Sequence, residues 1–175
     1  GGDALVVARH LHSSGYRDLL VFTIAPEAAR SPLFLHQLKR CELAGIRIVD
    51  LTEIPERVEQ IKSAELIVDG IFGIGLKKPV TEPYLSVIEA VNSSKAPKVS
   101  LDTPSGLNCG TGRVEGAAVR AALTITFGLA KPGFFVSEGP AHTGKLRVLP
   151  IGFPYEALRG ISTTHFLFTE RLARR

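Results

Sequence analysis

Short apolar segments alternate with helical segments along most of this chain, and this alternation constrains the fold more than any other feature. The expected strands cover residues 19–23, 46–50, 66–69, 99–102, 123–127 and 145–149. The expected helices cover residues 4–11, 32–44, 55–63 and 83–91. Ser31 and Pro32 are typical of a helix start, and Gly45 is typical of a helix end. Short apolar strands joined by helices predict an α/β fold, in which a parallel sheet is covered on both faces.

The composition fits one folded domain and argues against several other classes of protein. The 175 residues, 45% of them hydrophobic and 22% charged, are enough to bury one core. The net charge of +4 is small and dispersed, so it does not predict a nucleic-acid or membrane surface. Cys41 and Cys109 form neither a disulfide framework nor a metal motif, which predicts a reducing compartment and a cytoplasmic protein. No apolar run reaches the roughly 20 residues that span a bilayer.

Two of the expected strands end in an aspartate that is followed by a flexible loop. Asp69 precedes a glycine-rich loop at 70–79, and Asp102 precedes a sharp turn at Pro104-Ser105-Gly106. Acids at the carboxyl ends of parallel strands point into the crevice where α/β proteins bind ligands. A single aspartate at such a place often only caps a turn through its own backbone. Because two acidic strand ends occur here, each beside a flexible loop, we favour a functional site.

The glycine pair at the start of the first helix is a candidate third part of this site. Gly1, Gly2 and Asp3 precede the apolar helix directly, and the free N–H groups at a helix start attract anions such as phosphate. This signal is weak alone, since many such turns contain glycine for steric reasons. Residues 139–146 imitate a phosphate-binding loop, but they lack the final Ser or Thr and lead into a strand, so we reject that function.

The beginning of the sequence also carries information. The chain contains no methionine and opens on a glycine pair, which is typical of the middle of a loop. We therefore expect the sequence to be cut at its front.

Six segments resemble, in order, the signatures of the YjeF N-terminal family, the NAD(P)H-hydrate epimerases. They are GGDALVVARHL (1–11), VDGIFGIGL (68–76), SLDTPSGLN (100–108), TFGLAKPG (126–133), GKLRV (144–148) and IGFP (151–154). Their joint occurrence from residue 1 to about residue 154 is highly specific. Thr103 stands where the family often has an aliphatic residue, a departure that leaves the turn intact.

The resemblance implies a Rossmann-like three-layer αβα sandwich with a mostly parallel sheet. Family members carry two asparagines immediately before the glycines, and before these a central strand and an N-terminal helical region. None of these is present here, so we expect the fold to lack its first strand and N-terminal helices. We expect residues 1–154 to form the epimerase domain. Residues 155–175 are then either a simple extension or a connector to an ADP- or ATP-dependent dehydratase domain, as in bifunctional repair enzymes.

The resemblance also implies a potassium ion and a substrate site. In the family, one of the asparagines, an aspartate and a serine hold the ion, and the last two correspond to Asp69 and Ser105. With the asparagines missing, we expect this ion site to be incomplete. The residues that correspond to the family's substrate contacts are Gly1, Gly2, Asp3, Gly73, Ile74, Gly75, Leu76, Lys77, Lys78, Pro79 and Asp102.

The implied reaction interconverts the S and R forms of hydrated NADH and NADPH, a step of metabolite repair. The hydroxyl must leave and return, or the ring must open and close, and a positioned acid/base assists either route. We predict that Asp102 has this role. Lys77 and Lys78 are candidates for phosphate contact, although solvated surface explains them equally well, and the role of Lys131 is open in the same way.

Two other functions compete with this prediction. The same fold serves as an RNA- or protein-binding module in enhancer-of-decapping proteins, but such a module has no need for Asp69, Asp102 and Ser105 together. An ordinary dinucleotide dehydrogenase would show a G-x-G-x-x-G turn and an acid after its second strand, and the sequence shows neither. We therefore expect a small-molecule substrate and no membrane or nucleic-acid partner. We also expect self-association, because a sheet without its central strand leaves its neighbours unpaired.

Overall fold

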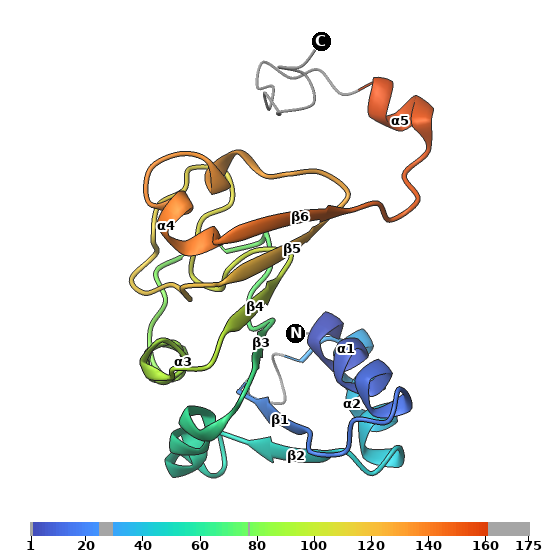
Figure 1. Cartoon of the computed structure of the whole chain (residues 1–175), viewed down its shortest axis with the longest axis vertical. Coiled ribbons are helices and arrows are strands. Elements are labelled where there is room, and N and C mark those ends of the chain that lie inside the picture. The colour runs from blue at the N-terminus through green and yellow to red at the C-terminus, as the bar shows by residue number, and fades with distance from the viewer. Residues whose placement is uncertain (1, 25–29, 77, 161–175) are drawn as a thin grey trace.

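Parallel β-strands form the centre of the computed structural model, which describes residues 2–24, 30–76 and 78–160 (Figure 1). The strands are β1 (Leu20–Thr23), β2 (Arg47–Asp50), β3 (Ile67–Asp69), β4 (Lys98–Leu101), β5 (Leu123–Phe127) and β6 (Lys145–Leu149). The α-helices are α1 (Gly2–Ser13), α2 (Pro32–Leu43), α3 (Tyr84–Ser93), α4 (Gly139–Thr143) and α5 (Tyr155–Arg159). Two 3₁₀-helices are labelled η2 (Pro55–Ser63) and η3 (Pro132–Phe134).

Among the described residues, the strands form two separate sheets, and every pairing is parallel. β1 pairs with β2, and the other four strands follow the order β3-β4-β5-β6. In the larger sheet, Asp69 on β3 lies opposite Ser100 on β4, which in turn lies opposite Thr124 on β5. The carboxyl ends of three neighbouring strands therefore meet at one edge. The predicted α/β fold with parallel strands is confirmed.

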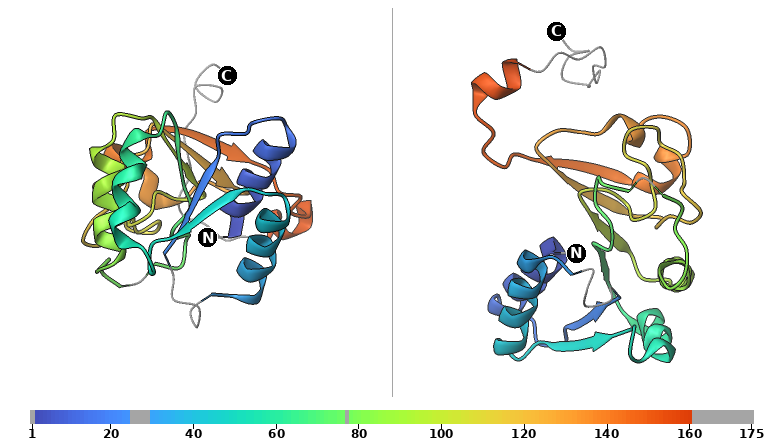
Figure 2. Two further views of the ribbon diagram at one scale, coloured as in Figure 1. Left: turned by 90° about the horizontal axis from the view of Figure 1, so that it is seen from below. Right: turned by 180° about the vertical axis from the view of Figure 1, so that it is seen from behind.

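Helices cover β1 and β2 on both faces, which produces three layers (Figure 2). On one face, α1 and α2 pack together around Leu5 and Cys41, with Val21 of β1 against them. On the other face, α3 and η2 surround a core that includes Ile88, with Leu20 and Phe22 of β1 against it. Since successive side chains of a strand point to opposite faces, a strand covered on both faces is expected to be mainly apolar, as Leu20, Val21 and Phe22 of β1 are.

Local signals account for where several helices begin and end. The Ser31 hydroxyl accepts a hydrogen bond from the Phe34 N–H (3.2 Å) at the start of α2, and Pro32 is the first helical residue. Gly45 follows the end of this helix with a φ of 76°, a conformation that glycine adopts at low cost. Both predicted boundaries are confirmed.

Two helical segments differ from the expectation. Residues 55–63 form a 3₁₀-helix, and no side chain caps their N-terminus at Ile54. The short helix α4 begins with Gly139 and Pro140 in a segment that the sequence analysis left without an element. The α4 segment leads into β6, as the sequence indicated when the phosphate-binding loop was rejected.

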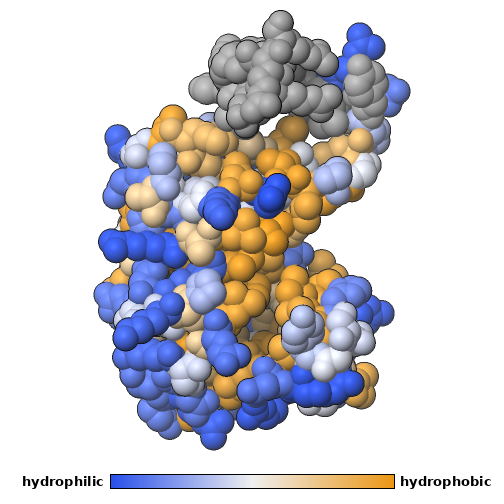
Figure 3. All heavy atoms as spheres, viewed as in Figure 1, coloured by the Kyte–Doolittle hydropathy of each residue, from blue (hydrophilic) through white to orange (hydrophobic). Residues whose placement is uncertain are grey.

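Apolar side chains are exposed where the larger sheet ends. Figure 3 shows apolar residues gathered over the middle of the face that Figure 1 presents. The exposed side chains at the ends of β5 and β6 and just beyond are Leu129, Val148, Leu149, Ile151 and Phe153. Within the described residues, β6 pairs only with β5 and is therefore an edge strand. Among all the residues that the structure describes, no helix is long and apolar enough to cross a membrane.

Candidate functional site

Asp69 ends β3 and is almost completely buried, with 3% of its surface exposed. Its Oδ2 atom accepts hydrogen bonds from the Ser100 hydroxyl (2.8 Å) and the Ser105 N–H (2.9 Å). Its Oδ1 atom accepts from the Ser105 hydroxyl (2.5 Å) and the Ile71 N–H (3.3 Å). The neighbouring strand and two loops therefore hold both carboxylate oxygens in place.

The charge of this carboxylate has no protein counter-charge in the described ranges. Burial raises the pKa of Asp69, and the hydrogen bonds from Ser105, Ser100 and Ile71 oppose that rise without cancelling it. No Lys, Arg or His among the described residues forms an ion pair with it. Buried charges are normally paired or bound to a cation. The buried Asp69 and the Ser105 hydroxyl thus bring hard oxygen atoms and an uncompensated negative charge together, a combination that suits a cation.

The turn after β4 places Ser105 beside Asp69. Gly106 has a φ of 92°, and a Cβ atom there would lie 1.8 Å from the Ala117 carbonyl oxygen, so only glycine fits. The Ser105 hydroxyl, which donates to Asp69, also accepts a hydrogen bond from the Phe72 N–H (3.0 Å). One serine therefore joins the turn, the end of β3 and the glycine-rich loop, and the structure brings Asp69 and Ser105 into direct contact.

Asp102 directly follows β4, and its φ of 64° is unusual for a residue other than glycine. Its carboxylate forms an ion pair with Lys131, with 2.6 Å between Oδ1 and Nζ. The same oxygen accepts from the Thr126 hydroxyl (3.2 Å) and the Phe127 N–H (3.3 Å) at the end of β5. The sequence left the role of Lys131 open, and the structure shows that Lys131 is the ionic partner of Asp102.

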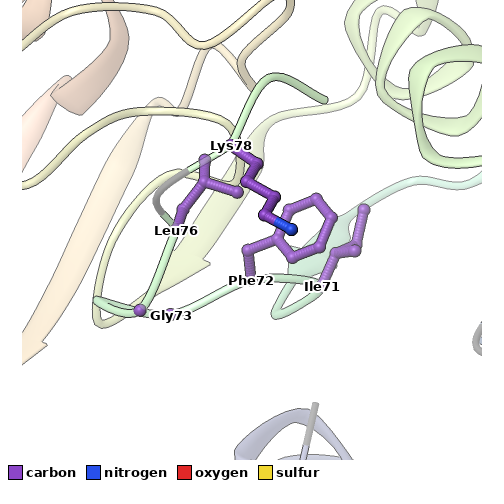
Figure 4. A pocket seen from close by; sticks show the side chains of 6 residues that line it. Ile71, Phe72, Gly73, Leu76 and Lys78 are labelled. Atoms are coloured by element: carbon purple, nitrogen blue, oxygen red, sulfur yellow. The ribbon is translucent and has the colours of Figure 1, made fainter. Parts of the chain in front are cut away.

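The glycine-rich loop after β3 lines a pocket of about 450 Å³. Figure 4 shows the lining side chains along this loop. The lining residues are Ile71, Phe72, Gly73, Gly75, Leu76 and Lys78. The Phe72 ring also packs against Tyr84 at the start of α3, with 4.8 Å between the ring centroids. Four of the predicted substrate contacts, Gly73, Gly75, Leu76 and Lys78, thus share one pocket, while Ile74 and Pro79 are exposed beside them.

The N-terminus of α1 lies against the same loop. A Cβ atom at Gly70 would be 2.9 Å from the Cβ of Ala4, so the helix and the loop approach as closely as glycine permits. This contact places the first turn of α1, which contains Gly2 and Asp3, beside the loop that follows β3, and their role in the site stays a prediction. Gly1 and Lys77, the other two predicted contacts, lie outside the described residues.

Three residues that the sequence analysis did not assign to the site take part in it. Ser100 and Thr126 are completely buried, and their hydroxyls donate to Asp69 and Asp102 respectively. Phe72 contributes its N–H to Ser105 and its ring to the pocket. The signal in the sequence was a hydroxyl residue within a mainly apolar strand.

These groups define what the site can do. A buried carboxylate and a hydroxyl can hold a cation, and a second carboxylate at the next strand end can exchange a proton. The described residues contain no cluster of three His, Cys, Asp or Glu that would suit a transition metal. The site therefore combines a cation position with acid/base chemistry beside an apolar pocket.

Comparison with known proteins gives a consistent result. Residues 1–133 match the family described as YjeF-related protein N-terminus. The chain is 40% identical over 148 residues to the NAD(P)H-hydrate epimerase of Limosilactobacillus fermentum. The aligned region covers 85% of this chain and 68% of that protein. It is also 40% identical over 163 residues to the bifunctional NAD(P)H-hydrate repair enzyme Nnr of Hyperthermus butylicus, covering 90% of this chain and 29% of the relative. The chain thus spans about two thirds of the first relative and under a third of the second.

A solved structure supports the fold. The crystal structure of yeast ynu0 (YNL200c) superposes with a TM-score of 0.72 at 22% sequence identity, covering 95% of this chain and 69% of the yeast chain. At this identity the similarity establishes the Rossmann-like architecture alone. The match over residues 1–133 shows that the chain belongs to the family of YjeF-related protein N-termini.

Proposed function

We propose that this protein is an NAD(P)H-hydrate epimerase, an isomerase that interconverts the S and R forms of hydrated NADH and NADPH. The observation that carries the proposal is the joint presence of Asp69, Ser105 and Asp102 at the ends of neighbouring strands, beside the pocket of the glycine-rich loop. The relative from Limosilactobacillus fermentum, at 40% identity, bears this name. A non-catalytic binding module is not favoured, because the relatives described above are named as enzymes.

Asp69 and Ser105 are the residues that would hold a cation. NAD(P)H-hydrate epimerases use a monovalent cation, and we propose potassium for this protein. The supporting observation is that Asp69 is buried without an ionic partner in the described part of the chain. When bound, the ion would supply positive charge that offsets nearby carboxylate and phosphate groups.

The other predicted site residues have binding and proton-transfer roles in this proposal. The helix start at Gly1, Gly2 and Asp3 and the loop from Gly73 to Pro79 would bind and orient the substrate. If the ring opens, the ionised Asp102 would take the hydroxyl proton as the aldehyde forms and the ring C–N bond breaks, and would pass a proton to the released nitrogen; closure on the other face reverses these transfers. If the hydroxyl leaves instead, a protonated Asp102 would give its proton to the hydroxyl, which departs as water, and would take a proton back from the water that returns. The division of the chain at residue 154, the cytoplasmic location and the homo-oligomer stay predictions.

Replacement of Asp102 tests the proposal. The complete gene product should convert one epimer into the other. Chromatography that separates the two forms measures this conversion. Asp102→Asn should lower kcat by about 10²–10⁴-fold with a smaller change in KM, because it removes the proton acceptor and keeps the shape of the side chain. Asp18→Asn is the matched control, since the Asp18 side chain is 97% exposed. A folded Asp102→Asn variant with wild-type turnover at saturating substrate would contradict the catalytic role.

A further inference from the structure

The two oxygens of the Asp102 carboxylate have very different surroundings. Oδ1 receives the Lys131 ammonium at 2.6 Å, the Thr126 hydroxyl at 3.2 Å and the Phe127 N–H at 3.3 Å. Oδ2 accepts no hydrogen bond from any residue that the structure describes. Within the described residues, Oδ1 is therefore fully occupied, and Oδ2 is left without a hydrogen bond.

Lys131 has no donor to spare for a substrate. Its Nζ donates to Asp102 Oδ1 (2.6 Å), to Thr126 Oγ1 (2.6 Å) and to the Phe127 carbonyl oxygen (3.0 Å). An ammonium group has three donors, and all three are used. The side chain is 16% exposed, so it is a largely buried charge held at a fixed point.

Thr126 connects the same two groups. Its hydroxyl accepts from Lys131 and donates to Asp102, and the residue is completely buried. Asp102 itself has a φ of 64°, an uncommon value for a residue other than glycine. Its N–H continues the β4–β5 pairing with a 2.7 Å bond to the Ile125 carbonyl oxygen. Backbone bonding and the Lys131–Thr126 pair thus fix both ends of this residue.

The pair lies next to the glycine-rich loop. The charges of Lys131 and Asp102 both act on the Cys109 thiol, whose pKa is raised by burial above all. The Cys109 sulfur in turn lies 3.7 Å from the Ile74 carbonyl oxygen in that loop. Asp102 is therefore close to the segment that we propose to bind the substrate.

We infer that Lys131 and Thr126 are positioning residues, which occupy Oδ1 of Asp102 and leave Oδ2 as the oxygen that exchanges a proton with the substrate. In this arrangement Oδ2 accepts one proton in one direction and returns it in the other, while Lys131 stays an ammonium throughout. The inference rests on the proposed epimerase function and assigns two residues to it beyond Asp102.

Substitution of Lys131 in the complete gene product tests this inference. Lys131→Met keeps the length of the side chain but removes the charge and all three hydrogen bonds. Because small misplacements of a reacting group are costly, kcat should fall by roughly 10²-fold, with little change in KM. Thr126→Val, which removes only the hydroxyl, should give a smaller loss of kcat. Lys95→Met is the matched control, because Lys95 is exposed and outside the site, and its kinetics should equal those of the wild type.

A further measurement separates positioning from a merely structural role. In Lys131→Ala, added ethylammonium should restore part of kcat in a concentration-dependent manner, and it should not affect the wild type.

The outcomes are distinguishable. A wild-type protein that does not interconvert the epimers would overturn the proposed function and this inference with it. An active wild type, together with Lys131→Met and Thr126→Val variants that fold and keep wild-type kcat, would overturn this inference alone. If Lys131→Met fails to fold, Thr126→Val and the ethylammonium experiment decide.

Discussion

The buried carboxylate of Asp69 is the least compensated charge that we find at the scale of single residues. Its four hydrogen bonds come from hydroxyls and backbone amides, none of which carries a positive charge. Such donors lower the cost of burying a carboxylate, yet burial still raises its pKa. A cation that binds beside Asp69 should therefore have a measurable effect on stability.

Potassium should raise the melting temperature of the wild-type protein. A ligand that binds only the folded state stabilises it by mass action, by about 2.7 kcal/mol at a hundredfold excess over Kd. Calorimetry in potassium chloride and in tetraethylammonium chloride at equal ionic strength measures the difference. Asp69→Ala should abolish the difference, whereas Asp18→Ala should retain it. Equal melting temperatures of the wild type in both salts would contradict the cation site.

Asp50 at the end of β2 should make stability depend on pH. Burial alone would raise its pKa, but hydrogen bonds from Thr52 and Arg30 and the charge of Arg30 outweigh burial, so the pKa lies below the usual 3.8. A lowered folded-state pKa adds stability above the unfolded pKa, and this is lost as the pH falls through the folded value. Asp50→Asn should therefore lower the free energy of unfolding, measured with urea, by about 1–3 kcal/mol at neutral pH. The difference should become progressively smaller below pH 3.8.

The control for that experiment is Asp18→Asn. Asp18 forms an ion pair with Arg47, but its side chain is 97% exposed, so its removal should change stability little at any pH. A constant difference between Asp50→Asn and the wild type across the acidic range would count against the ion pair with Arg30.

At the scale of elements, the turn after β4 should tolerate less change than other turns of similar backbone conformation. Gly106 and Gly45 both have positive φ, but only Gly106 faces a carbonyl oxygen, that of Ala117, where a side chain would stand. Gly45→Ala should cost about 1–2 kcal/mol for the left-handed conformation. Gly106→Ala should lower the free energy of unfolding, measured with urea, several times more than Gly45→Ala does, because the backbone around Ala117 must move as well. Equal costs would show that the contact with Ala117 is unimportant.

The elements themselves could be predicted well, because apolar runs bounded by glycine, proline and polar residues mark most of them. β5 and β6 occupy the predicted ranges, and α2 ends within one residue of its prediction. The contacts of the site could be predicted less well. That Asp69 and Ser105 belong together followed from the family resemblance, whereas the bonds of Ser100 and Thr126 depend on strand order and register. A sequence gives no direct measure of either.

At the scale of the whole molecule, the division of the strands into two sheets leaves open edges. In the described chain, β1 and β3 each pair on one side only, and β6 is a further edge strand with exposed apolar residues. Unpaired backbone groups and apolar surface at strand edges promote association between chains.

We therefore expect the 175-residue chain, expressed alone, to self-associate or aggregate. Sedimentation velocity at several concentrations should show species larger than a monomer. Val148→Lys, which places a charge on the exposed edge strand, should reduce the association, whereas Leu35→Lys, at a similarly exposed position in α2, should not. A monodisperse monomer that unfolds cooperatively would contradict this expectation.

The hydrogen bonds of the site also have a consequence for how this chain folds. The bonds between Asp69 and Ser105 span 36 positions, those between Asp69 and Ser100 span 31, and the pair of Asp102 and Lys131 spans 29. Each of these contacts requires a long loop to close, and the loss of chain entropy precedes the stabilising contact. Such contacts therefore form slowly compared with helical turns. Helix content would therefore return early during refolding, and the two carboxylates would find their partners only once β3, β4 and β5 had aligned. Recovery of the site is thus a late step, and a half-folded chain has no carboxylate in place to act on a nucleotide.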